Sequence, residues 1–100
     1  MGKYSVEYLP LAYNDLEDIF TYIVADDAEA ATTLLNEIDA AILRLEDFPD
    51  MGVNLKNRQL ANKGYKMLIV NEYPTFYVVT GDLVEIKRIV SSKQNYTKLL

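Results

Sequence analysis

Two long helical patterns that follow each other in the chain constrain its fold most. Apolar residues recur every three or four positions over residues 11–24 and again over 28–47, which is the spacing of an amphipathic helix. The break between them is short and contains Asp27, a residue type that caps helices. This arrangement predicts an antiparallel helical hairpin, whose apolar stripe needs a second layer of structure to cover it.

Strand patterns supply the second layer. Residues 3–9 alternate between apolar and polar side chains, and three later segments are rich in β-branched and aromatic residues: 65–70, 75–80 and 83–90. Turn residues at Asn71-Glu72 and Gly81-Asp82 predict that these three form consecutive hairpins. We therefore expect one α+β domain over residues 1–100, a two-layer sandwich in β-α-α-β-β-β order with the helical hairpin packed on an antiparallel sheet.

Two segments have weaker patterns. Residues 50–63 show no clear period, so we expect a loop there, with a short strand as an alternative. The last ten residues are compatible with a short helix that Ser92 caps, and Leu99 and Leu100 would return to the core.

The composition excludes several kinds of chemistry. The chain has no Cys and no His, so it lacks thiolate nucleophiles, disulfides, the commonest metal ligand and the usual general base near neutral pH. The acids at 15, 17 and 18 are best explained as a solvated helix face, and we expect no metal or cofactor. No stretch is apolar enough to cross a membrane and the N-terminus has no signal core, so we expect a cytoplasmic protein without a membrane partner.

Charge is divided unevenly along the chain. Residues 1–50 carry two bases and twelve acids, a net charge of −10, whereas residues 51–100 carry eight bases and three acids, a net charge of +5. The overall charge of −5 therefore hides one acidic and one basic surface. Ordinary solvated faces are the alternative explanation.

The basic half has the composition of a nucleic-acid-binding surface. Lys66 and Arg88 fall in the first and last of the three hairpin strands, and they would converge on one face if those strands are neighbours. A surface that serves only solubility is an equal alternative. Aromatic side chains lie among the bases; those in strands are mainly structural, whereas Tyr96 in the polar tail is a candidate for base stacking. The basic residues are Lys56, Arg58, Lys63, Lys66, Lys87, Arg88, Lys93 and Lys98.

Taken together, these segments resemble the RelE/ParE superfamily of toxins from type II toxin–antitoxin systems over nearly the full length. The segments that carry the resemblance are, in chain order, Tyr8 to Ile23, Ala41 to Leu45 with Phe48-Pro49 and Gly52, Gly64 to Leu68, Tyr73, Phe76 to Val79, and Glu85 to Leu100.

The resemblance implies one of two activities and a partner. RelE-like members cleave mRNA on the ribosome with the RNA's own 2′-hydroxyl, ParE-like members inhibit DNA gyrase, and a cognate antitoxin neutralises both. RelE-like cleavage is the leading expectation; gyrase inhibition, or a non-toxic member that only binds its antitoxin, is the alternative. The resemblance assigns catalysis to Lys66, Arg88, Lys93 and Tyr96. The basic run predicts nucleic-acid binding by Lys56, Arg58, Lys63, Lys66, Arg88 and Lys93. Lys66 stands where Arg is usual.

Overall fold

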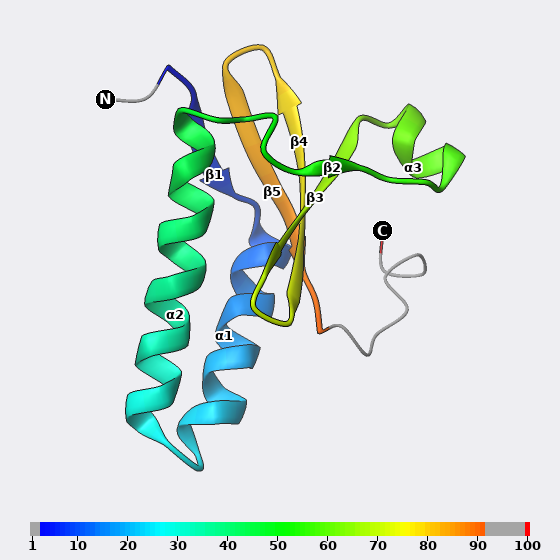
Figure 1. Cartoon of the computed structure of the whole chain (residues 1–100). Coiled ribbons are helices and arrows are strands. Elements are labelled where there is room, and N and C mark those ends of the chain that lie inside the picture. The colour runs from blue at the N-terminus through cyan, green and yellow to red at the C-terminus, as the bar shows by residue number, and fades with distance from the viewer. Residues whose placement is uncertain (1–2, 92–99) are drawn as a thin grey trace.

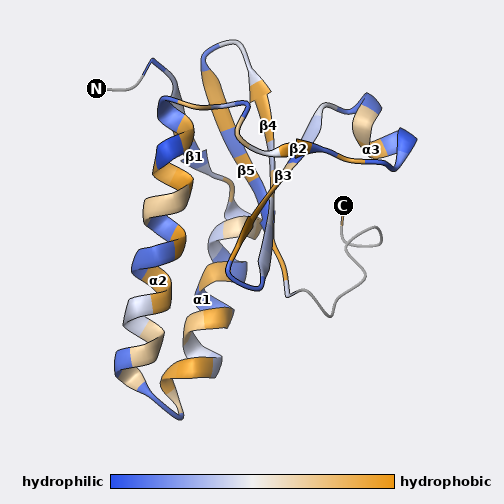
Figure 2. Cartoon of the chain, viewed as in Figure 1, coloured by the Kyte–Doolittle hydropathy of each residue, from blue (hydrophilic) through white to orange (hydrophobic). Residues whose placement is uncertain are grey.

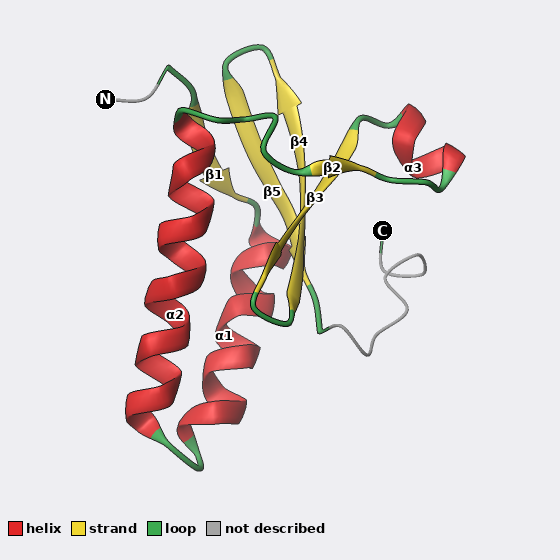
Figure 3. Ribbon diagram, viewed as in Figure 1, coloured by secondary structure: helices red, strands yellow, loops and turns green. Residues whose placement is uncertain are grey.

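A computed structural model describes residues 3–91 and residue 100, and it confirms the α+β sandwich. A helical hairpin of α1 (Pro10–Val24) and α2 (Ala28–Leu43) lies against a five-stranded sheet (Figures 1 and 3). The strand order is β1-β5-β4-β3-β2. The strands are β1 (Ser5–Tyr8), β2 (Val53–Asn54), β3 (Tyr65–Val70), β4 (Tyr73–Thr80) and β5 (Leu83–Ile89).

Local sequence explains the bounds of the two long helices. Pro10 occupies the first turn of α1, where its missing N–H costs nothing. The predicted cap of α2 is confirmed, because the Asp27 carboxylate accepts a hydrogen bond from the backbone N–H of Ala30 at 3.0 Å. The second helix was expected to run to residue 47, but it ends at Leu43 and tightens into a 3₁₀ turn, Arg44–Glu46. Pro49 disfavours helix in the residue before it, so the α-helix cannot continue through this segment.

The three hairpin strands are confirmed, and the first strand adds to them in parallel. β4 pairs antiparallel with both β3 and β5, and the turns fall at Asn71 and Gly81, which both have positive φ (54° and 62°). β1 pairs parallel with β5, so the complete sheet is mixed rather than purely antiparallel. β5 thereby becomes an interior strand, and α1 begins directly beside it.

The segment from 50 to 63 has more structure than a loop. The alternative of a short strand is confirmed, since β2 pairs with β3. A five-residue helix, α3 (Arg58–Asn62), was not predicted, because one turn and a half is too short to show a helical period. Its cap is Asn57, whose side-chain oxygen accepts from the N–H of Leu60 at 3.1 Å.

Each face of the sheet carries its own apolar cluster. The larger one lies between the sheet and the helical hairpin, and Figure 2 shows hydrophobic and hydrophilic residues alternating along α2 as this packing requires. Its fully buried members include Ile38, Ile42, Tyr77 and Ile86.

The smaller cluster lies on the opposite face of the sheet. Leu60 of α3 packs there with Leu55, Phe76 and Val90. Leu100 also packs against this cluster, in line with its expected return to the core. The remainder of the expected C-terminal helix, with Ser92 and Leu99, lies outside the described residues. Within residues 3–91 and 100, no helix is long and apolar enough to span a membrane.

Candidate functional site

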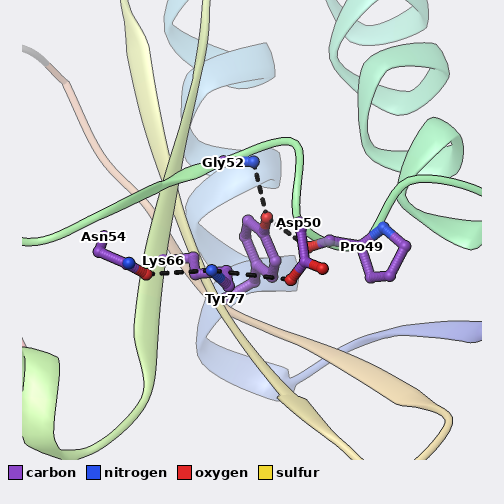
Figure 4. A network of polar contacts seen from close by, with 6 residues as sticks. All are labelled: Pro49, Asp50, Gly52, Asn54, Lys66 and Tyr77. Carbon is purple, nitrogen blue, oxygen red and sulfur yellow. Dashed lines mark hydrogen bonds and ion pairs between the residues drawn. The ribbon is translucent and has the colours of Figure 1, made fainter.

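Lys66, the first of the predicted site residues, is held by Asn54 of β2 and by Asp50 of the loop that precedes β2. Its ammonium donates a hydrogen bond to the side-chain oxygen of Asn54 at 3.0 Å and forms an ion pair with Asp50 at 3.7 Å (Figure 4). The Lys66 side chain is only 21% exposed, whereas that of Asp50 is 88% exposed. A water-exposed carboxylate at this distance contributes little free energy, on the order of 0–1 kcal/mol, so Asn54 is the more defined partner.

Tyr77 fixes the loop that carries Asp50 and leads into β2. Its buried hydroxyl donates to the carbonyl of Pro49 at 2.7 Å and accepts from the N–H of Gly52 at 2.9 Å (Figure 4). Burial raises the pKa of the Tyr77 phenol, so the group stays neutral and able to donate. The expectation of a mainly structural role for the strand aromatics therefore fits Tyr77.

Arg88, the second candidate, forms a bidentate salt bridge with Asp15 of α1. Arg88 donates from Nε at 2.7 Å and from Nη2 at 2.9 Å to the two carboxylate oxygens, and the N–H of Ile89 donates to the same carboxylate at 3.0 Å. The hydrogen bond that Arg88 donates to Asp15 raises the pKa of the Arg88 guanidinium, and burial acts in the opposite direction. The side chains are 17% and 15% exposed, so this charge pair is largely removed from water.

This geometry corrects the expected place of Asp15. The helical pattern put it on the solvated face of the first helix, but it closes the edge of β5 beyond the end of β1. β1 pairs with β5 only as far as Tyr8, which is opposite Ile86. Beyond that point the Asp15 carboxylate accepts the hydrogen bond from the N–H of Ile89 that a backbone carbonyl of a longer β1 would have accepted.

Convergence of Lys66 and Arg88 on one face was expected only if their strands were neighbours, and the structure does not meet that condition. β4 lies between their two strands, and Lys66 is opposite Tyr77 whereas Arg88 is opposite Phe76. Because Phe76 and Tyr77 are consecutive residues of one strand, they point to opposite faces of the sheet. Lys66 therefore lies on the face of the helical hairpin, and Arg88 on the other.

A bulge causes this separation. The register shifts between Phe76 and Tyr77, because Tyr77 is opposite Ile86 while Phe76 is opposite Arg88, which leaves Lys87 as an extra residue in β5. Regular alternation from Ile86 would have placed Arg88 on the same face as Lys66. The extra residue reverses the side of Arg88, and nothing in the strand pattern marks it.

The other predicted site residues fall either near the Arg88 face or outside the described part of the chain. Lys56, Arg58 and Lys63 are exposed and belong to the segment around α3, which packs over the face that carries Arg88. Lys93 and Tyr96 lie outside the described residues. In the described part of the chain, no group of three or more acidic residues is placed to hold a metal ion. The assignment of catalysis and RNA binding to all of these residues stays a prediction.

The fold defines the class to which the chain belongs. The chain matches a structure of the chromosomal ParDE toxin–antitoxin system from P. aeruginosa with a TM-score of 0.76 at 19% identity, covering 91% of this chain and 98% of that one. A chain of the YoeB-YefM complex from Staphylococcus aureus matches with a TM-score of 0.57 at 17% identity, covering 86% and 93%. The YoeB dimer from the same species gives 0.56 at 17% identity, covering 87% and 94%. These matches show that the chain shares the α+β fold of these solved toxin structures.

A match to a family model identifies the family of the chain. The model of the ParE toxin of the type II toxin–antitoxin system parDE matches residues 6–96, which is most of the chain. A search of curated proteins finds no match. The chain belongs to the ParE toxin family, and it is a toxin of a type II toxin–antitoxin system.

Proposed function

We propose that this toxin inhibits DNA gyrase, as the ParE-like alternative implies, and that a cognate antitoxin neutralises it. The observation that carries the proposal is the separation of Lys66 from Arg88 on opposite faces of the sheet. Membership of the ParE family points to the same branch.

The separation bears on catalysis because RNA cleavage needs several groups at one phosphate. Positive charges stabilise the transition state only where they converge within hydrogen-bond reach of the reacting oxygens. Here Lys66 is bonded to Asn54, and Arg88 is bonded to Asp15 at the edge of β5. Without convergence of these two bases, the surface is better suited to binding another protein than to cleaving RNA.

A supercoiling assay tests the proposal. Purified toxin added to purified gyrase and relaxed plasmid is expected to reduce supercoiling at micromolar concentrations, and added antitoxin should restore it. Relaxation by a topoisomerase of another type, with the same toxin preparation, is the control for nonspecific effects on DNA. Full supercoiling activity at micromolar toxin would remove the gyrase proposal.

RelE-like mRNA cleavage is the second candidate, and one observation favours it. Lys56, Arg58 and Lys63 lie on the segment that covers the Arg88 face, so several bases are gathered around one side of the sheet. Such a surface attracts RNA phosphates through charge and counterion release. Cleavage would additionally need groups from the tail, where Lys93 and Tyr96 were predicted.

Mapping of mRNA ends after induction in cells separates the two candidates. Under the gyrase proposal, growth stops while transcripts stay intact, and Lys66→Ala changes neither result. Cleaved transcripts that disappear in Lys66→Ala, Arg88→Ala, Lys93→Ala or Tyr96→Phe would instead establish the nuclease. Lys3→Ala, which removes a base from the acidic half, serves as the charge-matched control.

A further inference from the structure

The segment around α3, residues 56–64, presents a basic surface that contains no acid. Its bases are Lys56, Arg58 and Lys63, and every residue of the segment except Leu60 is exposed. Along the chain, no acid occurs anywhere in residues 51–71. None of the three bases forms an ion pair with another residue in the part of the chain that the structure describes. Within that part, their charges are therefore left to solvent or to a ligand.

Apolar anchors hold this surface against the sheet. Leu55 and Leu60 are 7% and 4% exposed, and they belong to the cluster that includes Phe76 of β4. Arg58 begins α3, and Lys63 directly follows its last residue. The backbone that carries the bases is thereby placed before a ligand arrives, which lowers the entropy cost of binding.

The exposed side chains of the segment favour a phosphate backbone over a protein partner. Protein interfaces depend on aromatic and aliphatic anchors, whereas the exposed residues here that are not basic are only Asn, Gln, Ala and Gly. Lys, Arg, Asn and Gln are all side chains that donate hydrogen bonds to phosphate oxygens. The exposed part of the segment therefore has the composition of a phosphate-binding surface.

The same composition favours duplex DNA over single-stranded RNA. Unpaired bases are bound by stacking on exposed aromatic rings, and residues 56–64 contain no aromatic residue. A DNA duplex keeps its bases stacked inside and presents one phosphate charge about every 1.7 Å along its axis. Contact with such a backbone requires positive charge and hydrogen-bond donors, which this segment provides.

We propose that the segment around α3 binds the phosphate backbone of duplex DNA without sequence preference. The role of this contact rests on the proposed function. Because gyrase acts on duplex DNA, a toxin that binds the enzyme also meets the DNA that the enzyme holds. The bases of the segment then strengthen the grip of the toxin on the complex of gyrase and DNA.

The acidic helical hairpin does not prevent this contact. The hairpin and α3 pack on opposite faces of the sheet (Figure 1). Charges that are further apart than about 10 Å are largely screened at about 0.1 M salt. The net charge of −5 therefore weakens the long-range attraction between toxin and DNA, but it leaves the local contact of Lys56, Arg58 and Lys63 with phosphates intact.

Fluorescence anisotropy of the full chain with a labelled duplex of about 20 base pairs measures the contact. Three phosphate contacts predict that log K falls with log salt concentration with a slope of about −2.7, a loss of about 40-fold between about 50 and about 200 mM salt. Lys56→Ala, Arg58→Ala and Lys63→Ala should each reduce this slope by about one. Lys3→Ala, at an exposed base of the acidic half, should leave it unchanged.

Two results of this titration would overturn the proposal. One is the absence of duplex binding at about 100 µM toxin in about 50 mM salt, where nonspecific DNA binding is readily detected. The other is a salt slope that Lys3→Ala changes as much as the three variants of the segment. Binding of a poly-Glu peptide in place of the duplex would show that the surface takes an acidic protein instead.

A single-stranded RNA of the same length is the second probe. Its lower charge density predicts weaker binding than that of the duplex, with a slope of about −2.1 for three contacts. Tighter binding of the RNA would overturn the assignment to duplex DNA and would support the nuclease candidate.

Supercoiling by gyrase tests the role of the contact. The triple variant Lys56→Ala/Arg58→Ala/Lys63→Ala should need about tenfold more toxin for the same inhibition. Its urea midpoint should stay unchanged, because all three side chains are exposed. Equal inhibition by the wild type and the triple variant would remove the contact from the inhibition of gyrase. If wild-type toxin leaves gyrase active, the proposed target is wrong, while the anisotropy measurements still decide DNA binding.

Discussion

Asp15→Ala is expected to lower the free energy of unfolding by about 2–4 kcal/mol. The substitution removes the carboxylate that accepts two hydrogen bonds from Arg88 and one from the backbone of Ile89. Breaking a buried charge pair by removing one partner typically costs about 3–5 kcal/mol, and the slight exposure of this pair reduces that figure. Urea unfolding followed by circular dichroism measures the change as a shift in the midpoint.

Asp18→Ala is the matched control for this prediction. Asp18 is an exposed acid on the same helix, so its removal changes the net charge equally and should alter stability by no more than about 0.5 kcal/mol. Asp15→Asn should fall between the two variants, because an amide keeps one acceptor but loses the charge. Equal urea unfolding midpoints for Asp15→Ala and Asp18→Ala would show that the salt bridge between Arg88 and Asp15 does not stabilise the fold.

The order of helices and strands could be predicted because each long element carries its own periodic pattern. The stripe through Ile38 and Ile42 indicates a helix that needs a sheet to cover it, and Asp27 marks where that helix begins. The turn residues at Asn71 and Gly81 define the hairpins equally well. The parallel place of β1 beside β5 was not predictable in this way, because a single alternating strand does not say which neighbour it pairs with.

For the candidate site, the sequence predicts the residue types but not their arrangement in space. The basic half is real, but its geometry depends on one extra residue, Lys87, which reverses the side of Arg88. The partner of Arg88 is 73 positions away along the chain, so no local pattern connects it with Asp15. The acceptors of Lys66 come from a segment without a period. Each of these contacts belongs to tertiary structure, where a single sequence gives residue types and no distances.

The acidic and basic halves of the sequence lie in different parts of the fold. The hairpin has an apolar groove with Glu17 and Asp39 on its walls, and the segment around α3 carries exposed bases over the opposite face of the sheet.

Gly52→Ala is expected to lower the free energy of unfolding by about 2–3 kcal/mol. A methyl group at this position would lie 2.7 Å from the Tyr77 hydroxyl oxygen and 2.9 Å from the carbonyl oxygen of Met67. Tyr77 is fully buried and the Met67 oxygen is part of the backbone of β3, so neither can move without cost. The loop must shift away from the sheet, which also withdraws Asp50 from Lys66.

A double-mutant cycle with Tyr77→Phe separates this clash from a general loss of loop structure. Tyr77→Phe alone leaves the Gly52 N–H and the Pro49 carbonyl without their phenol partner, at a cost of about 1–3 kcal/mol. In the double variant the oxygen nearest the added methyl group is absent, so the combined loss should be smaller than the sum of the two single losses by about 1 kcal/mol. Strict additivity in urea unfolding would show that Gly52 and Tyr77 do not constrain each other. The loop would then owe its position to contacts other than the Tyr77 hydroxyl.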